Sequence, residues 1–292
     1  MSTTVYQIVT DRILAKLSEG IIPWQKPWDV EAGAPKNLAS KREYRGINSF
    51  LLGMSGFESP YWMTYRQAQQ FGANVRKGEK STPVVFWKQL DTTDKKTGDA
   101  ISIPLLRYYN VFNLAQIENL PAKYAPPAVE SADRVFNPIQ SAAALVDAMP
   151  QRPQLVHGST AAYYRPSTDT VSMPRPETFV GSPEYYSTLF HELAHSTGAA
   201  VRLNRPEITA GDISFGSHSY GREELLAEMA AAFLCATAGI EMTIDNSAAY
   251  VQSWMRTIKA DSKLLVLAAS GAQKAADFIL NRSPVAVEAD AE

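Results

Sequence analysis

Two histidines stand four residues apart in the string His191-Glu192-Leu193-Ala194-His195. On an α-helix, residues i and i+4 lie on the same face, so His191 and His195 could present two imidazoles to one metal ion. Glu192 lies about 100° further round such a helix, close enough to accept a proton from a water on that ion. The spacing therefore predicts one divalent ion, Zn²⁺ by preference, with Glu192 as the catalytic base. The alternative is a helix with two satisfied histidines and some surface acids.

A catalytic zinc site keeps three protein ligands, and we expect the third from a later helix. Glu224 and Glu228 lie four residues apart in a run that is otherwise apolar, where a carboxylate is costly to bury unless it is paired or bound to a metal. We predict Glu224 as the metal ligand and Glu228 as the partner that orients a histidine, with the reverse assignment open. Glu223 is expected to face solvent. Cys235 is the one cysteine, which excludes a cysteine-based zinc site.

Two more polar residues precede this later helix. His218 and Tyr220 are candidates to stabilise an oxyanion opposite the metal, although ordinary loop residues are the simpler interpretation.

The elements that must position these residues carry clear helix signals. Ser182, Pro183 and Gly198 predict a helix over 182–198, with the serine as its cap and the glycine as its stop. A second helix is predicted over 222–238. A short β region around residues 161–163 and 170–173 precedes the first helix, which is the order in which zinc peptidases set an edge strand beside the metal.

The first half of the chain differs from the second in charge. Residues 1–124 carry 16 Lys and Arg against 11 Asp and Glu, whereas the remainder carries 12 against 19. The basic half also contains four of the five tryptophans. Basic groups follow phosphates and aromatic rings stack on unpaired bases, so this half is suited to single-stranded nucleic acid. The alternative is that the rings are ordinary core residues.

Local patterns in this half predict an α+β arrangement. A helix is expected over 5–17, a two-turn helix after the capping box of Thr64 and Gln67, and a hairpin of strands 83–87 and 101–112. We predict two domains, at residues 1–124 and 139–284, the second mostly helical with a small sheet. Residues 125–138 form the expected linker and 285–292 an acidic, disordered tail.

The overall composition is that of a globular protein, with 45% apolar and 20% charged residues. No apolar run approaches the roughly 20 residues of a membrane span. The first residues lack the pattern of a secretion signal, and a single cysteine forms no intrachain disulfide. We therefore expect a cytoplasmic protein without membrane contact.

Motifs in both halves resemble those of ArdC-type antirestriction proteins of conjugative plasmids. In the first half these are Pro23-Trp24, Pro27-Trp28, Tyr44-Arg45-Gly46, Trp62-Met63-Thr64, Lys77-Gly78-Glu79 and Val111-Phe112-Asn113. In the second half they are the segments 190–195, 202–203 and 223–228. The resemblance covers nearly the whole chain in the expected order. It implies an N-terminal domain that binds single-stranded DNA and a C-terminal zincin-like metallopeptidase domain.

This family implies protection of DNA that enters by conjugation, with a host restriction enzyme or another host protein as candidate target. It implies a zinc-dependent, gluzincin-like peptidase site, and leaves open whether cleavage is needed. The alternatives are a pure DNA-binding shield with a structural metal, or an accessory of a primase. The residues expected to contact DNA are basic or aromatic: Trp24, Lys26, Trp28, Lys41, Arg42, Tyr44, Arg45, Trp62, Arg66, Arg76, Lys77, Lys80 and Trp87.

Overall fold

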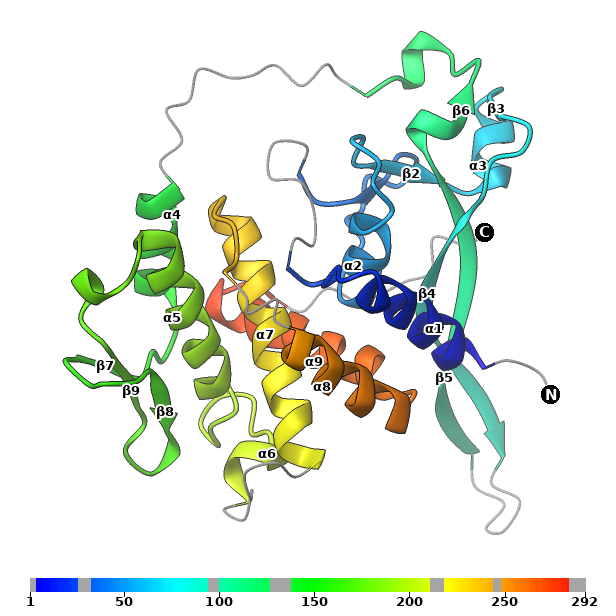
Figure 1. The fold of residues 1–292 in the computed structure, drawn as a ribbon. Helices are drawn as coiled ribbons and strands as arrows, with labels where there is room; N and C mark the ends of the chain where they lie inside the picture. Colours follow the sequence, from blue (N-terminus) through cyan, green and yellow to red (C-terminus); the bar gives the residue numbers. More distant parts are fainter. Residues whose placement is uncertain are drawn as a thin grey trace.

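The computed structural model describes residues 4–25, 33–93, 100–126, 138–210, 218–243 and 248–283. Most of the predicted linker, the predicted acidic tail, Lys26 and Trp28 lie outside these residues. Both halves of the chain contain helices and strands (Figure 1), so the predicted α+β class is confirmed. No helix in the described ranges has the length and apolar character to span a bilayer.

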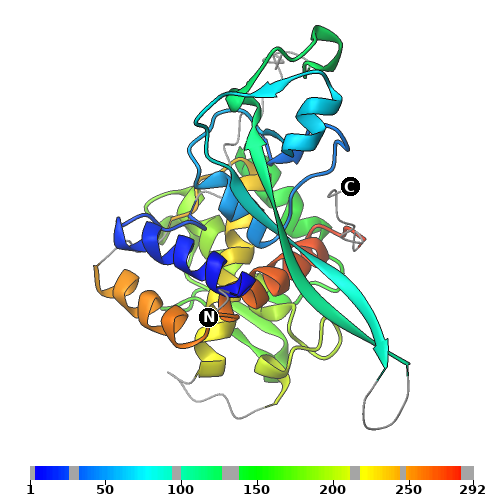
Figure 2. The ribbon, with the colours of Figure 1, turned by 90° about the vertical axis from the view of Figure 1, so that its right-hand side faces the viewer.

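The first half is built on a sheet in the order β1-β2-β5-β4. Its elements are α1 (Val5–Ser18), β1 (Lys36–Asn37), α2 (Ile47–Gly53), β2 (Tyr61–Met63), α3 (Tyr65–Gln70), β3 (Asn74–Val75), β4 (Thr82–Thr93), β5 (Ala100–Asn113) and β6 (Ile117–Glu118). The capping box predicted at the start of α3 is present. Strands β4 and β5 form a long antiparallel hairpin in which backbone pairing continues through a polar stretch, well past the predicted ends. Figure 2 shows this hairpin on the side facing the viewer.

The second half is mostly helical with a three-stranded sheet. Its elements are α4 (Pro138–Ala148), β7 (Gln154–His157), β8 (Tyr163–Arg165), β9 (Thr170–Met173), α5 (Ser182–Ser196), α6 (Pro206–Thr209), α7 (His218–Ala238), α8 (Ala248–Ala260) and α9 (Leu264–Ile279). The sheet order is β7-β9-β8, with β9 parallel to β7 and antiparallel to β8. Strand β8 is thus an edge strand, and α5 follows the sheet in the chain.

Two predicted helix starts differ from the structure. Gly181, rather than Ser182, is the N-cap of α5, and Pro183 occupies its first turn. Helix α7 begins at His218, so His218 and Tyr220 lie in its first turn and not in a loop. The sequence around them is polar and glycine-containing, which favours a loop locally. Packing of the apolar remainder of α7 against other helices outweighs that preference.

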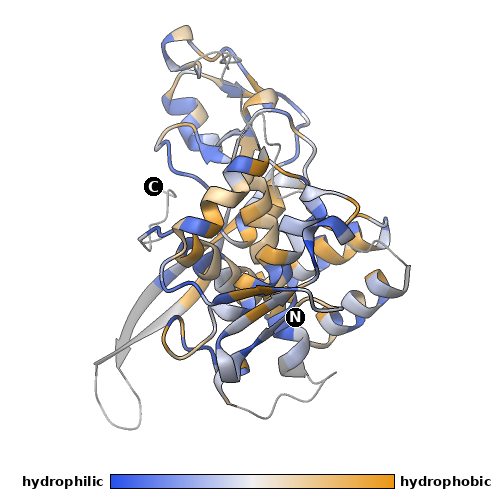
Figure 3. Cartoon of the chain, turned by 90° about the vertical axis from the view of Figure 1, so that its left-hand side faces the viewer, coloured by the Kyte–Doolittle hydropathy of each residue, from blue (hydrophilic) through white to orange (hydrophobic). Residues whose placement is uncertain are grey.

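One hydrophobic core joins the two halves of the chain. Phe50 of α2 stacks on Phe233 of α7 at a centroid distance of 4.8 Å. The ring of Trp24, fully buried after α1, meets the edge of Trp254 of α8 at 6.2 Å. Both pairs belong to a single cluster of buried side chains drawn from both halves. Figure 3 shows hydrophobic residues concentrated where the central helices meet. The domain boundary near residue 124 stays a prediction, but any boundary there cuts through a shared core.

Polar contacts reinforce the same junction. The guanidinium of Arg45 forms an ion pair with Asp277 of α9. The amide of Gly46, at a φ of 58° that favours glycine, donates to Gln273 Oε1 at 3.0 Å. A Cβ at Gly46 would lie 3.6 Å from the backbone oxygen of Ala269. The segment 45–46 therefore fastens the first half to α9.

We expect Phe233→Ala to destabilise both halves of the chain together. Removing this buried ring should lower the free energy of unfolding by about 3–5 kcal/mol, because it leaves a cavity in the shared core. Urea unfolding followed by circular dichroism and tryptophan fluorescence measures the effect. Tyr65→Ala, at a ring that is 52% exposed, is the control and should change stability little. Two separate transitions, of which Phe233→Ala moves only one, would contradict a shared core.

Candidate metal centre

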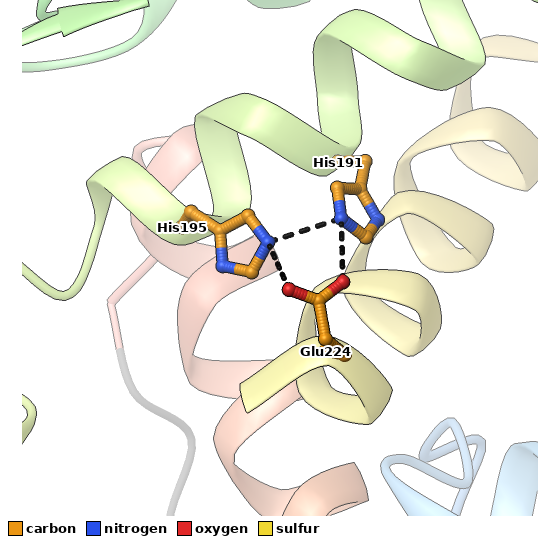
Figure 4. A group of neighbouring side chains, drawn as sticks. All are labelled: His191, His195 and Glu224. Atoms are coloured by element: carbon orange, nitrogen blue, oxygen red, sulfur yellow. Dashed lines mark hydrogen bonds and ion pairs between the residues drawn. The ribbon is translucent and has the colours of Figure 1, made fainter. Parts of the chain in front are cut away.

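Helices α5 and α7 pack side by side and bring two histidines and one glutamate together (Figure 4). The Nε2 atoms of His191 and His195 lie 3.0 Å apart. Glu224 reaches across from α7, with one carboxylate oxygen 3.5 Å from His191 Nε2 and the other 3.6 Å from His195 Nε2. Within the described part of the chain, this is the one group of side chains arranged to hold a metal ion.

The donor set of this triad fits a divalent ion. Ligand atoms at 2.0–2.1 Å from Zn²⁺ in tetrahedral geometry lie about 3.3 Å from one another. The separation of the two histidine nitrogens, 3.0 Å, and their distances to the two Glu224 oxygens, 3.5 and 3.6 Å, lie close to this value. Two imidazoles and one carboxylate are also the ligands of known three-ligand catalytic zinc sites. The residues present therefore fit the expected metal.

Mutual stabilisation shifts the protonation of the triad. Burial lowers the pKa of His191, but the hydrogen bond to Glu224 and the surrounding carboxylates outweigh it and raise the pKa to about 9. Burial raises the pKa of Glu224, but its contacts with the two histidines lower it below its usual value. The protonated imidazole of His191 and the ionised carboxylate of Glu224 thus stabilise each other in one partly buried cluster.

Glu223 is buried beside the triad, so the expectation that it faces solvent is wrong. It is 4% exposed, and its Oε1 lies 3.1 Å from His195 Nδ1. Arg205 donates to both of its oxygens, from Nε at 3.0 Å and from Nη2 at 2.5 Å. Burial raises the pKa of Glu223, but the hydrogen bonds from His195 and Arg205 lower it overall. A carboxylate on the far nitrogen of a histidine fixes the tautomer and ring orientation that a metal ligand needs.

Arg205 reaches Glu223 because the chain turns tightly after α5. Gly198 lies in this turn, and a Cβ there would meet Ile208 Cγ1 at 2.5 Å and Cβ at 2.9 Å. Arg205 also donates to Thr197 Oγ1 at 2.6 Å and to the carbonyl of Ala194 at 2.9 Å. A small residue at 198 thus allows one arginine to close the end of α5 and to neutralise Glu223.

Glu228 lies one turn further along α7 from Glu224 and has a different partner. It accepts a hydrogen bond of 2.8 Å from the hydroxyl of Tyr250, and burial raises its pKa. It lies near enough to His191 to contribute to the raised pKa of that imidazole. The structure brings Glu224, rather than Glu228, into the triad, and the contact expected of Glu228 with a histidine is made by Glu223. Sequence signals for Glu223 are weak, because its partners Arg205 and His195 belong to other elements.

A cavity of about 720 Å³ opens beside the triad. Glu192 is 8% exposed and lines it together with Tyr163 and Tyr164 of the edge strand β8. Tyr220 also lines it, and burial with the nearby carboxylate of Glu224 raises the pKa of this phenol to about 12. With this pKa the hydroxyl keeps its proton at neutral pH and can donate a hydrogen bond. His218 begins α7, but its side chain lies outside the described residues.

Most aromatic residues expected to contact DNA serve the core. Trp24 and Trp62 are 0% and 2% exposed, and Tyr44 is 6% exposed. A ring enclosed by protein has no face for a base, so we correct the expectation for these three. Trp87 is half-buried and meets the edge of Tyr6 at 6.4 Å. Rings as large as these are favoured core residues in a small sheet, and the sequence pattern does not separate the two roles.

Most of the basic residues expected to contact DNA are exposed to solvent. Arg45 is committed to Asp277, and Arg76 pairs with Glu79 at 3.0 Å. Six of these side chains are exposed to solvent, namely Lys41, Arg42, Arg66, Arg76, Lys77 and Lys80. Exposure makes these side chains accessible to phosphate, although Arg76 among them pairs with Glu79.

Comparison with family models gives one match in each half. Residues 3–112 match the N-terminal domain of anti-restriction factor ArdC. Residues 141–271 match a zincin-like metallopeptidase family, a span that contains His191, Glu192, His195 and Glu224.

Solved structures and curated proteins resemble the chain over most of its length. The crystal structure of the antirestriction protein ArdC from the R388 plasmid, in metal-free form, is 37% identical, covers 96% of this chain and 99% of that chain, and has a TM-score of 0.74. Its Mn(II)-bound structure is 38% identical, covers 95% and 97%, and has a TM-score of 0.73. The uncharacterized protein y4eC of Sinorhizobium fredii (strain NBRC 101917 / NGR234) is 35% identical over 95% of this chain and 92% of its own length. The DNA primase TraC of Escherichia coli is 35% identical over 94% of this chain, which spans only 27% of that primase.

The position of Glu223 predicts a role in metal affinity. Glu223→Gln removes the negative charge behind His195 and should weaken binding of Zn²⁺ or Mn²⁺ about 10- to 100-fold. Isothermal titration calorimetry on the metal-stripped full chain measures this. Glu207→Gln is the matched control, because Glu207 lines the same cavity and pairs with Arg222 rather than with a histidine. Unchanged affinity in a folded Glu223→Gln protein would argue against the role.

Proposed function

Because the chain belongs to the ArdC antirestriction protein family, we propose that it binds single-stranded DNA entering by conjugation and protects it from host restriction enzymes. The proposal assigns the DNA to the basic first half of the chain and a metal-dependent reaction to the second half. The triad of His191, His195 and Glu224 beside an open cavity is the observation that carries the second assignment.

The proposed metal is one divalent ion, Zn²⁺ by preference, held by the triad. The zincin-like family match and the Mn(II)-bound structure of the R388 protein support a divalent ion. Such an ion, when bound, supplies Lewis-acid polarisation of a carbonyl and makes water more acidic. Glu223 and Arg205 hold His195 in the orientation that a ligand requires.

The remaining side chains of the cavity suit hydrolysis of a peptide bond. Glu192 lines the cavity next to both histidines, where its carboxylate can accept a proton from an attacking water. The Tyr220 hydroxyl, which forms a hydrogen bond with Glu224 and is kept neutral by its raised pKa, is the proposed donor to a developing oxyanion. Edge strand β8 borders the same cavity and offers unpaired backbone groups to an extended peptide. A host restriction enzyme or another host protein is the proposed substrate.

Two alternatives use the same fold without peptide cleavage. In the first, the protein is a DNA-binding shield whose metal ion stabilises the junction of α5 and α7. In the second, which the TraC match raises, the protein assists a primase. The described residues contain one candidate metal cluster, and it lies on two packed helices with a histidine pair. That donor set favours hydrolysis over nucleotide polymerisation, which uses carboxylate-bound Mg²⁺.

Glu192→Gln separates the peptidase from the shield. The amide keeps the shape of the side chain but accepts no proton, so hydrolysis of a protein substrate should fall at least about a hundredfold, while metal content and DNA binding stay unchanged. The assays are protein hydrolysis, elemental analysis and protection of transferred DNA in mating. The double variant His191→Ala/His195→Ala is the control that should lose the metal. Full antirestriction by Glu192→Gln would favour the shield.

Binding of single strands should depend strongly on salt. We expect the full chain to prefer an oligothymidine to a duplex of equal length, because base stacking needs unpaired bases. Affinity should fall steeply as salt rises, since phosphate contacts release counterions. Fluorescence anisotropy at several salt concentrations measures both effects. Equal affinity for duplex would rule out the stacking mode.

A further inference from the structure

One face of the β4–β5 hairpin combines two rings with two cations. In the strand register, Phe86 lies opposite Arg107, Lys88 opposite Leu105, and Val84 opposite Tyr109. Residues directly opposite in an antiparallel pair share a face, as do residues two apart along a strand. Phe86, Lys88, Arg107 and Tyr109 therefore lie on one side of the hairpin, and we call them the hairpin face.

The two sides of the hairpin have different surroundings. On the opposite side, Val85 and Leu106 are buried in the shared core and Trp87 packs against it. On the side of the hairpin face, Val84 and Val111 at the inner end join a small cluster around Trp62, and Tyr109 packs against it. Further along this side, Lys88 and Arg107 are exposed, whereas Phe86 and Leu105 are half-buried. Figure 2 shows the hairpin running past the helices on the side that faces the viewer.

The rings of this face are placed for stacking. Phe86 and Tyr109 are half-buried, which fixes them in position and leaves part of each ring accessible. Their centroids lie 5.6 Å apart, and their planes are inclined by 56°. Two rigid rings at this spacing can each receive a base at low cost in conformational entropy.

The charge of the face is entirely positive at its described positions. Lys88 and Arg107 are exposed, and neither forms an ion pair with a residue that the structure describes. No acidic residue occurs among the described positions of this side, from 82 to 88 on β4 and from 105 to 111 on β5. Cations that have no ion-pair partner among the described residues, beside accessible rings, match the phosphates and bases of an unpaired strand. A duplex would offer the phosphates but no free base to stack.

From this arrangement, we infer that the hairpin face is a contact surface for single-stranded DNA, with bases on Phe86 and Tyr109 and phosphates on Lys88 and Arg107. The inference rests on the proposed binding of single strands and locates part of it on residues that no sequence motif singled out. The surface lies on the opposite side of the molecule from the metal centre, with the hairpin to the right of Figure 1 and β8 and α5 to the left.

Two full-length variants test the stacking and the phosphate contacts separately. Phe86→Leu keeps an apolar side chain at this position but removes the ring, and should weaken binding of an oligothymidine about 5- to 100-fold. Lys88→Gln/Arg107→Gln should lower the slope of log affinity against log salt by about 1.4, or about 0.7 for each lost phosphate contact. Fluorescence anisotropy measures affinity, and thermal unfolding confirms that each variant is folded. Arg175→Gln, an exposed arginine next to the second-half sheet, is the control that should change neither value.

Each outcome of the test bears on this surface. Losses in both variants, with a normal Arg175→Gln protein, support it. Wild-type affinity and slope in both folded variants overturn it, and the proposed function then stands with the strand bound elsewhere, for example at Lys41, Arg42 and Arg66. Absence of oligothymidine binding in the wild-type protein overturns both this inference and the DNA part of the proposed function.

Discussion

Helix α7 is apolar on almost every side, and this constraint organises the molecule. Its residues 225–235 are nearly all buried, and a helix of this kind is stable only inside a core. Neighbouring helices α4, α5 and α9 cover it, and Phe50 of α2 stacks on it from the first half of the chain. Glu223 and Glu224 consequently lie near one end of α7, where they contact the histidines of α5. Burial of α7 fixes the distance between the two histidines and Glu224, and so forms the candidate metal centre.

The same burial determines how the charges of the site are compensated. Glu223 is turned inward with α7 and would be a costly unpaired charge. Arg205 and His195 both contact it, so the arginine neutralises a carboxylate that in turn orients His195, a candidate metal ligand. A glycine at position 198 makes this geometry possible. Three segments of the chain thus contribute to one unit, which consists of His195, Gly198, Arg205 and Glu223. The effects of substitutions among these residues are not expected to be additive.

Several local patterns in the sequence predict the structure correctly. The histidine pair, the capping box at Thr64 and the helix over 182–198 follow from spacing within one element. Predictions of exposure are wrong where a residue packs against partners that are distant in the chain. Glu223 was expected in solvent because nothing nearby predicted Arg205 behind it. Trp24 and Trp62 were expected on DNA because a tryptophan beside basic residues fits either role, and only packing against α8 or against Leu52 and Val84 decides between them.

The hairpin and the candidate metal centre lie on opposite sides of one molecule (Figure 1), and this separation affects how a target protein would reach the cavity. A strand held along the hairpin would leave the cavity beside β8 open, so the two sites could be occupied simultaneously. A protein bound to the same strand would then be tethered to the cavity by the DNA between them. Its effective concentration at the cavity would be set by the length of that DNA, rather than by its concentration in the cell. Even a weak intrinsic affinity of the cavity would suffice for such a neighbour, whereas proteins away from the strand would be left untouched.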